Sequence, residues 1–243
     1  MTLSESATNN RTLVIIPARN EAETVGRVVR EIKDIPGYDV VVIDDRSVDA
    51  TIAEAKGAGA VVLPLVMRLG AWGAMQTGMR YALAHGYEVV VTMDADGQHP
   101  VAAISDLVEP LKKKHVDVTI GACVARGSRQ RKIAWRFFKA LTGLAIEDLT
   151  SGFRAYNLAA LQLLASPVAT LLDYQDLGVL LLLQKHGLKV SEVETRMSLR
   201  VAGRSRIFSS WWVILLYLLE SGLLSLSRRN GFRAPLNVNI NKG

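Results

Sequence analysis

Cysteine is almost absent from this sequence of 243 residues, which contains only Cys123. A single cysteine excludes an internal disulfide and a zinc site built from several cysteines, and it is typical of a reducing compartment. The sequence also lacks a G-x-G-x-x-G piece after its first apolar run, where it reads PARNEAETVG, and it lacks a Walker-type lysine loop. These absences indicate that any bound phosphates are held by a metal rather than by a glycine cradle.

The first ten residues, MTLSESATNN, lack the basic start and apolar stretch of a signal peptide, and we expect them to form a disordered tail. Hydrophobic residues make up 49% of the chain, and its mean hydropathy of +0.20 is high for a soluble enzyme. The net charge of +6 favours an anionic partner, whether nucleotide, phospholipid surface or nucleic acid. The length fits one ordinary domain or one domain with an appendage.

Short apolar runs alternate with stretches of helical periodicity, which predicts an α/β fold with a parallel, doubly wound sheet. The predicted strands are Thr12–Ile16, Asp39–Ile43, Ala60–Leu65, Val89–Met93, Val116–Gly121 and Leu188–Val193. The predicted helices are Ala22–Ile32, one capped by Ser47 or Asp49, then Ala71–His85, Val101–Lys113 and Tyr174–His186.

Acidic residues follow two of the predicted strands. Asp44 and Asp45 end the second, while Asp94 and Asp96 follow the run Val89–Met93. Ligands of open α/β sheets bind beyond the carboxyl ends of the strands, and Mg²⁺ is usually held by one or two carboxylates plus substrate phosphates. Gln98 and His99 extend this candidate ligand set. The alternative is an Asp-rich turn with no metal.

Five pieces of sequence, in this order and spacing, resemble family 2 glycosyltransferases of the GT-A fold. The resemblance is to the polyprenol-phosphate (dolichol-phosphate mannose synthase-like) branch and covers about residues 12 to 206. It implies a Rossmann-like, mostly parallel sheet flanked by helices. The pieces are VIIPARNEAETV (Val14–Val25), VVIDDRSVDAT (Val41–Thr51), LGAWGAMQTGMRYA (Leu69–Ala82), VVVTMDADGQHP (Val89–Pro100) and DLTSGFRAYN (Asp148–Asn157).

The resemblance implies a role for each matching position. Asp94, Asp96 and Gln98 resemble the site for a divalent metal, Mg²⁺ or Mn²⁺, and the diphosphate. Asp148 and Arg154 resemble residues on the sugar and acceptor side, with Arg154 a candidate to face the phosphates. The implied nucleotide-binding residues are Pro17, Ala18, Asn20, Glu21, Asp44, Asp45 and Gly73. For Arg19, Glu23 and Arg46, simple surface charge is the alternative.

The sequence departs from the family pattern at two places. Arg68 stands where the family commonly has Asn, and Trp72 replaces a glycine, which puts sugar-nucleotide specificity in doubt there. Val101 and Ala102 occupy the region where an acidic residue is common. Neither change removes a group that the chemistry requires.

Basic residues offer a site for an acceptor phosphate. Residues 118–146 contain six basic residues and no acid, with interleaved aromatics that suit an anionic membrane surface. Arg126 and Arg131 are candidates there, and Arg204 and Arg206 lie in VAGRSR, which resembles a piece that helps to hold lipid phosphate. Nothing resembles a nucleic-acid-binding motif, so nucleic acid is not an expected partner.

The stretch Ile207–Leu226 is long enough to span a membrane, but Glu220 argues against a stable span. The alternatives are an interfacial helix, which we favour, a true span, or an apolar helix at a dimer contact. We therefore predict a tail (1–10), a GT-A domain (11–206) and a membrane-interface or dimer-contact segment (207–243). Asp173 and Asp176 lie where many family members place a catalytic base, and they rank below Asp148.

The resemblance implies a metal-dependent, inverting enzyme. It would move a hexose from a UDP- or GDP-sugar to a polyprenyl phosphate at the cytoplasmic face of the membrane, as a peripheral protein that is a possible homo-oligomer. The alternatives are a glycolipid or polysaccharide acceptor, an inactive sugar-nucleotide-binding scaffold, and a nucleotidyltransferase. The last usually has a Gly-rich basic loop after the first strand, which this chain lacks.

Overall fold

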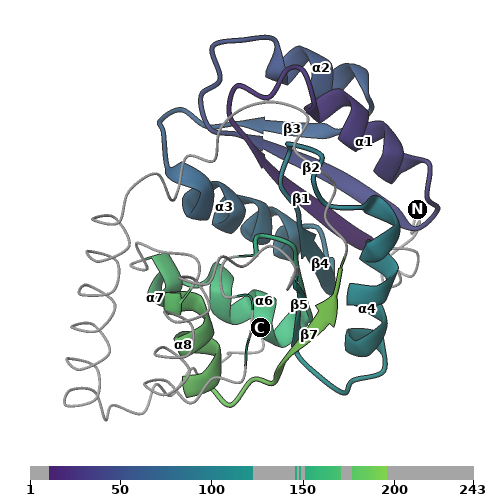
Figure 1. Cartoon of the computed structure of the whole chain (residues 1–243). Helices are drawn as coiled ribbons and strands as arrows, with labels where there is room; N and C mark the ends of the chain where they lie inside the picture. The colour runs from purple at the N-terminus through teal and green to yellow at the C-terminus, as the bar shows by residue number, and fades with distance from the viewer. Residues whose placement is uncertain (1–10, 123–145, 147, 149–150, 171–176, 196–243) are drawn as a thin grey trace, which may run out of the picture. The chain divides into compact units, whose positions relative to one another are not determined.

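A computed structural model describes residues 11–122, 146, 148, 151–170 and 177–195. These residues form a seven-stranded sheet with the strand order β3-β2-β1-β4-β6-β5-β7 (Figure 1). Strands β1 to β4 are mutually parallel, as are β5 and β7. The strands are β1 (Thr12–Ala18), β2 (Tyr38–Asp44), β3 (Val61–Pro64), β4 (Val89–Thr92), β5 (Val118–Ala122), β6 (Arg154–Tyr156) and β7 (Val190–Glu194).

The central strands are apolar in their middle residues because helices cover both faces of the sheet. On one face, Val14 and Ile16 pack in a core cluster with residues of α1, α2 and α4. On the other face, α3 contacts β1, β2 and β4, and α6 contacts β4 and β6. The helices are α1 (Val25–Lys33), α2 (Thr51–Gly57), α3 (Gly70–Ala84), α4 (Ile104–Lys112), α6 (Leu158–Ala165), α7 (Pro167–Thr170) and α8 (Leu177–Lys185).

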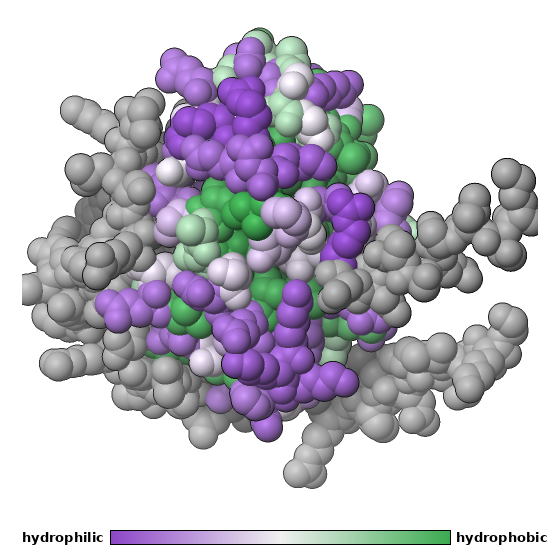
Figure 2. Space-filling model, turned by 90° about the vertical axis from the view of Figure 1, so that its right-hand side faces the viewer, coloured by the Kyte–Doolittle hydropathy of each residue, from purple (hydrophilic) through white to green (hydrophobic). Residues whose placement is uncertain are grey.

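Helix α1 follows from the spacing of its apolar residues. Val25, Val28, Val29 and Ile32 are all buried, and they recur at the three- and four-residue intervals that place side chains on one helical face. The intervening charged residues are exposed. Figure 2 shows this side of the molecule, on which hydrophilic residues lie above and below a central region that includes hydrophobic ones. The predicted helix is thus confirmed, although it begins three residues later than Ala22.

Strand β6, which the sequence did not predict, makes the sheet mostly rather than wholly parallel. It runs antiparallel to both β4 and β5, with Arg154 opposite Thr92 and Ile120. A strand of three residues has no measurable periodicity, and its direction is set by partners distant in sequence. The amino end of β6 therefore arrives at the edge where β4 ends.

All six predicted strands are confirmed within two residues at each end, and the predicted helix Val101–Lys113 begins as a 3₁₀ turn, Val101–Ala103, before α4. No helix in the described part of the chain is long and apolar enough to cross a membrane. The predicted tail 1–10 and segment 207–243 lie outside the described residues.

Candidate functional site

The carboxyl ends of β2, β1 and β4 lie next to one another in the sheet and carry most of the residues predicted to bind ligand. Asp44 ends β2, Ala18 ends β1, and Asp94 and Asp96 follow β4. The register pairs Ala18 with Asp44. Neighbouring strands are about 4.8 Å apart, so roughly 10 Å separates the first carboxylate from the strand that leads to the other two.

Asp44 is only 1% exposed, and its two carboxylate oxygens differ. Oδ2 accepts a hydrogen bond from the backbone N–H of Ser47 at 3.1 Å. Oδ1 is buried and has no hydrogen-bond partner. A buried carboxylate oxygen without a donor is costly, and such exceptions call for an explanation. A ligand N–H group would supply the missing donor.

Asp45 has both of its carboxylate oxygens engaged by the protein. Oδ1 accepts from Leu69 N at 2.7 Å, and Oδ2 accepts from Gly70 N at 3.0 Å. These N–H groups open α3 and have no partner within the helix, so the carboxylate caps them and complements the helix dipole. The structure thus gives Asp45 a role in placing α3 beside β2, while its contact with nucleotide stays a prediction.

The loops after β1 and β2 are joined by several hydrogen bonds. Asn20 N donates to Ser47 Oγ, and Val48 N donates to Asn20 Oδ1, both at 2.9 Å. Glu21 N donates to Thr51 Oγ1 at 2.8 Å. The side chain of Asn20 therefore ties one loop to the other, and its left-handed backbone (φ 55°) is one that asparagine tolerates.

Asp49 adds a further link between these loops. Its Oδ2 accepts from Ala22 N at 3.2 Å, and its Oδ1 accepts from Thr51 N at 3.0 Å and from the Thr51 hydroxyl. Desolvation alone would raise the pKa of Asp49, but these hydrogen bonds outweigh it and lower that pKa below its ordinary value. Of the two predicted caps for α2, Asp49 is the one that bonds the first helical residue.

The residues after β4 hold one another in a tight turn. Gln98 N and Gln98 Nε2 donate to Asp96 Oδ1 and Oδ2, at 3.0 Å and 2.5 Å. Gly97 lets the backbone turn back from Gln98 to Asp96 because its φ is 71°, which glycine adopts without strain. A side chain at this position would also come within 2.2 Å of Arg27 Nη2. The side chains of Asp96 and Gln98 therefore lie together, as the prediction that they share a ligand requires.

Asp94 is held from the other side. The Nε2 atom of the buried His99 lies 3.3 Å from Asp94 Oδ2, so this bond requires the ring proton on Nε2. The same ring stacks on Phe153 with its centroid 4.9 Å away. A side chain at Gly152 would approach Asp94 Oδ1 to 3.1 Å, so the glycine lets the segment before β6 pass close to the carboxylate. The two motifs around Asp94 and Gly152, far apart in sequence, meet here.

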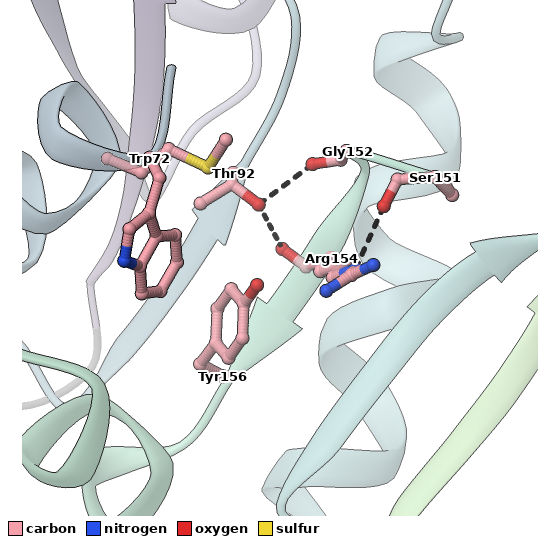
Figure 3. Close-up of a pocket in the computed structure, with 7 residues that line it drawn as sticks. Trp72, Thr92, Ser151, Gly152, Arg154 and Tyr156 are labelled. Atoms are coloured by element: carbon pink, nitrogen blue, oxygen red, sulfur yellow. Dashed lines mark hydrogen bonds between the residues drawn. The ribbon is translucent and has the colours of Figure 1, made fainter. Parts of the chain in front are cut away.

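A small pocket lies where β4 meets β6 (Figure 3). Arg154 is 3% exposed, and its Nε donates to Ser151 O at 2.8 Å. Thr92 Oγ1 donates to Gly152 O at 2.8 Å, which fixes the approach to β6. The pocket is lined by Trp72, Met75, Thr92, Ser151, Gly152, Arg154 and Tyr156.

Trp72, which lines this pocket, is itself buried. Its Nε1 donates to Ala169 O at 2.9 Å, and it is 8% exposed. Gly73 follows it in the first turn of α3 and is half-buried.

Two further predicted site residues lie on other elements. Asp148 is 8% exposed, and its backbone N–H donates to Oε1 of Glu192, a residue of β7, at 2.7 Å. Pro17 lies within β1, paired with Ile43.

The donor set after β4 consists of carboxylate and amide oxygens, which fit a hard divalent cation such as Mg²⁺ or Mn²⁺. Among the described residues, no group of three or more His, Cys, Asp or Glu side chains converges to hold a metal by itself. A cation at Asp94, Asp96 and Gln98 would need further ligands, which for Mg²⁺ are usually water molecules and substrate phosphates.

Several candidate residues lie outside the described part of the chain. They are the phosphate-binding candidates Arg126, Arg131, Arg204 and Arg206, and the possible bases Asp173 and Asp176. Their roles stay predictions. Within the described part, the structure adds Arg19, whose Nε is buried without a partner. Its position next to the strand end was the only signal for it in the sequence.

The family model described as "Glycosyl transferase family 2" matches residues 13–162. An undecaprenyl-phosphate mannosyltransferase from Micrococcus luteus is 32% identical over 163 residues, which are 60% of this chain and 66% of that protein. A polyprenol monophosphomannose synthase from Mycolicibacterium smegmatis is 32% identical over 169 residues, 63% of each chain. The chain thus spans slightly less than two thirds of the length of these two relatives.

A crystal structure of glucosyl-3-phosphoglycerate synthase from Mycobacterium tuberculosis, in complex with Mn²⁺, UDP and phosphoglyceric acid, superposes with a TM-score of 0.67. The sequences are 19% identical, and the match covers 93% of this chain and 80% of that one. This likeness shows a shared fold, the GT-A fold. The predicted fold class is therefore confirmed.

Proposed function

Because the chain belongs to glycosyl transferase family 2, we propose that it transfers a hexose from a nucleoside-diphosphate sugar to a polyprenyl phosphate. The observation that carries the proposal is the placement of Asp44 and of the Asp94–Asp96 pair on two strand ends that flank β1. In this proposal, the end of β2 offers the carboxylate oxygen of Asp44 as a hydrogen-bond acceptor to the nucleobase. The residues after β4 offer oxygen ligands to a metal beside the diphosphate. The curated relatives named above for polyprenol-phosphate mannose transfer support the acceptor class.

The proposed reaction needs little acid–base catalysis from the protein. An acceptor phosphate is already anionic at neutral pH, so its oxygen attacks the anomeric carbon without losing a proton to a base. The bond from that carbon to the nucleoside diphosphate breaks, and a bond to the lipid phosphate forms. A single displacement of this kind inverts the anomeric configuration.

The residues of the site then have distinct tasks in the proposal. Asp44 binds the base, and Asp94, Asp96 and Gln98 hold a divalent metal together with the diphosphate. The metal, when bound, supplies Lewis-acid stabilisation of the departing diphosphate. The protein contributes orientation, since Gln98 and His99 each fix one of the carboxylates. We place the enzyme at the cytoplasmic membrane face as a peripheral protein, on the strength of its basic and apolar C-terminal segments.

The test is a transfer assay with UDP- and GDP-hexoses and a polyprenyl phosphate in detergent micelles, with Mn²⁺ or with EDTA. We expect one donor to give a lipid-linked hexose of inverted configuration, and EDTA to abolish it. Asp96→Ala should lose at least 100-fold in rate because it removes a metal ligand, whereas the exposed carboxylate variant Asp34→Asn should keep the wild-type rate.

The outcomes separate the alternatives. Transfer only to a glycolipid or polysaccharide would replace the acceptor in the proposal. Binding of nucleotide without transfer to any acceptor would favour an inactive scaffold. Wild-type rates in Asp96→Ala would overturn the metal assignment.

A further inference from the structure

Helix α1 contacts the turn that carries Asp96 and Gln98. A Cβ on Gly97 would lie 2.2 Å from Arg27 Nη2, and the three nearest atoms to that point all belong to the Arg27 guanidinium. The guanidinium therefore lies directly against the backbone of the turn, which has room for it only because residue 97 has no side chain. Two segments that are distant in the sequence thus meet at Gly97.

Glu31 orients Arg27 toward the turn. Arg27 Nη1 donates to Glu31 Oε1 at 2.8 Å, one helical turn further along α1. The two side chains are 44% and 47% exposed, and an exposed pair of this kind adds little to stability. The pair does restrict the rotamers of Arg27, because Nη1 is bound to Glu31 while Nη2 lies at Gly97.

The backbone of Gly97 determines how two of the candidate metal ligands meet. Gln98 N donates to Asp96 Oδ1 at 3.0 Å, so a change in the backbone of the glycine between them separates the two residues. Glycine has the widest conformational freedom of all residues, and it can leave the φ of 71° seen here. Packing against Arg27 limits that freedom.

We propose that Arg27 is a positioning residue for the metal site. By packing on Gly97, it keeps the turn closed while the site holds no metal, so Asp96 and Gln98 are already together when the cation binds. Preorganised ligands bind more tightly because less conformational entropy is lost on binding. The inference rests on the proposed function, from which it takes the assignment of Asp96 and Gln98 as metal ligands.

The charge of Arg27 allows this role to be distinguished from an electrostatic one. A guanidinium beside the turn repels a cation bound there, so on charge alone the removal of Arg27 would strengthen metal binding. Loss of the support that Arg27 gives to the turn would weaken it. The two effects have opposite signs, and the sign of the measured change decides between them.

The test is titration of Mn²⁺, followed by electron paramagnetic resonance, in the presence of UDP or GDP. Arg27→Ala should weaken Mn²⁺ binding about tenfold, a loss typical of residues that orient metal ligands. Glu31→Gln should weaken it by a smaller factor, since Arg27 stays but loses its charged partner. Arg30→Ala removes the same charge from an exposed position on the same helix and should bind Mn²⁺ like the wild type.

The metal-free protein provides a second measurement. Exchange of the Gln98 amide proton reports its hydrogen bond to Asp96, and it should be faster in Arg27→Ala than in the wild type or in Arg30→Ala. The midpoint of urea unfolding should be unchanged, because the pair of Arg27 with Glu31 is exposed. A lower midpoint with unchanged Gln98 exchange would make Arg27 merely structural and overturn the proposal.

Gly97→Ala tests the contact itself. The added Cβ meets Arg27 Nη2 and also strains the backbone, so this variant should be less stable than the wild type. Its cost should be smaller in the Arg27→Ala background, where only the backbone strain remains. An equal cost in both backgrounds would show that Arg27 moves aside freely and does not hold the turn.

The proposed function fails separately. If the wild-type chain binds no Mn²⁺ with either nucleotide, the metal assignment falls, and the metal role of Arg27 falls with it. If the wild type binds Mn²⁺ and Arg27→Ala binds it equally well or more tightly, only the inference about Arg27 is wrong.

Discussion

Asp44 and Asp45 are adjacent residues with the same side chain, but their carboxylates have different hydrogen-bond partners. Both carboxylate oxygens of Asp45 accept hydrogen bonds from the first N–H groups of α3, whereas one buried oxygen of Asp44 has no donor. The resemblance to the family implied that both contact the nucleotide, because the two residues follow the same strand. The difference comes from where α3 begins in space, which the local pattern does not encode.

Asp49 offers a prediction at the same scale. Its pKa is lowered in the folded protein, so its contribution to stability is present above its unfolded pKa of about 3.9 and is lost as pH falls through the folded value. Asp49→Ala should lower the free energy of unfolding by about 1 kcal/mol at pH 7. The difference from the wild type should shrink below about pH 4.

Urea unfolding at pH 7 and at decreasing pH measures this difference. Asp34→Asn is the control, because it also removes an exposed carboxylate but has none of the links between the two loops. An equal stability difference at pH 7 and pH 3 would show that the carboxylate charge of Asp49 does not matter.

Helix α3 is fixed by three side chains that stand four residues apart on one face. Trp72 Nε1, Gln76 Nε2 and Arg80 Nε donate to the backbone carbonyls of residues 169, 164 and 165, at 2.9, 2.7 and 3.0 Å. The last carbonyls of a helix have no partner within it, so α3 supplies the donors that α6 and α7 need. This connects the helix after β3 to the segment after β6.

We expect Trp72→Phe to lower the free energy of unfolding by about 1 kcal/mol, since one buried hydrogen bond is lost and most of the ring remains. Trp72→Gly, which restores the residue common in the family, should cost about 3–5 kcal/mol or more because it also leaves a cavity. Chemical denaturation measures both. If Trp72→Gly were as stable as the wild type and bound nucleotide more tightly, Trp72 would be an obstruction rather than a support.

Elements were predictable from sequence where a local signal existed. The apolar run Thr12–Ile16 and the spacing in α1 indicated β1 and its helix correctly. Asn157 precedes α6 and accepts a hydrogen bond from Ala160 N, a cap that the sequence does display. Strand β6 and the role of Trp72 were not predictable, because one rests on pairing with Thr92 and the other on a carbonyl 97 residues away.

For the molecule as a whole, ligand binding and folding should be linked. A nucleoside diphosphate with Mn²⁺, at 100 times its dissociation constant, stabilises the folded state by about 2.7 kcal/mol. For a chain of this size we expect the melting temperature to rise by about 5 to 10 °C. Differential scanning fluorimetry measures the shift, and EDTA should reverse its metal-dependent part.

The control for that shift is Asp96→Ala, which should respond to nucleotide equally with Mn²⁺ and with EDTA. A Mn²⁺-dependent shift of wild-type size in this variant would place the metal elsewhere. The basic residues outside the described part of the chain would then be the next to test for diphosphate binding.

The antiparallel strand β6 also has a consequence for how the protein opens. In the described sheet, β6 alone connects β1–β4 to the β5–β7 pair, through the three residues Arg154–Tyr156. A fluctuation that releases this strand divides one sheet into two, so the amide protons of β5 and β7 should exchange with solvent as one cooperative unit. Gly152 and Phe153 precede β6 and lie against Asp94 and His99. The same fluctuation therefore separates these residues of the candidate site, and bound substrate should slow the amide exchange.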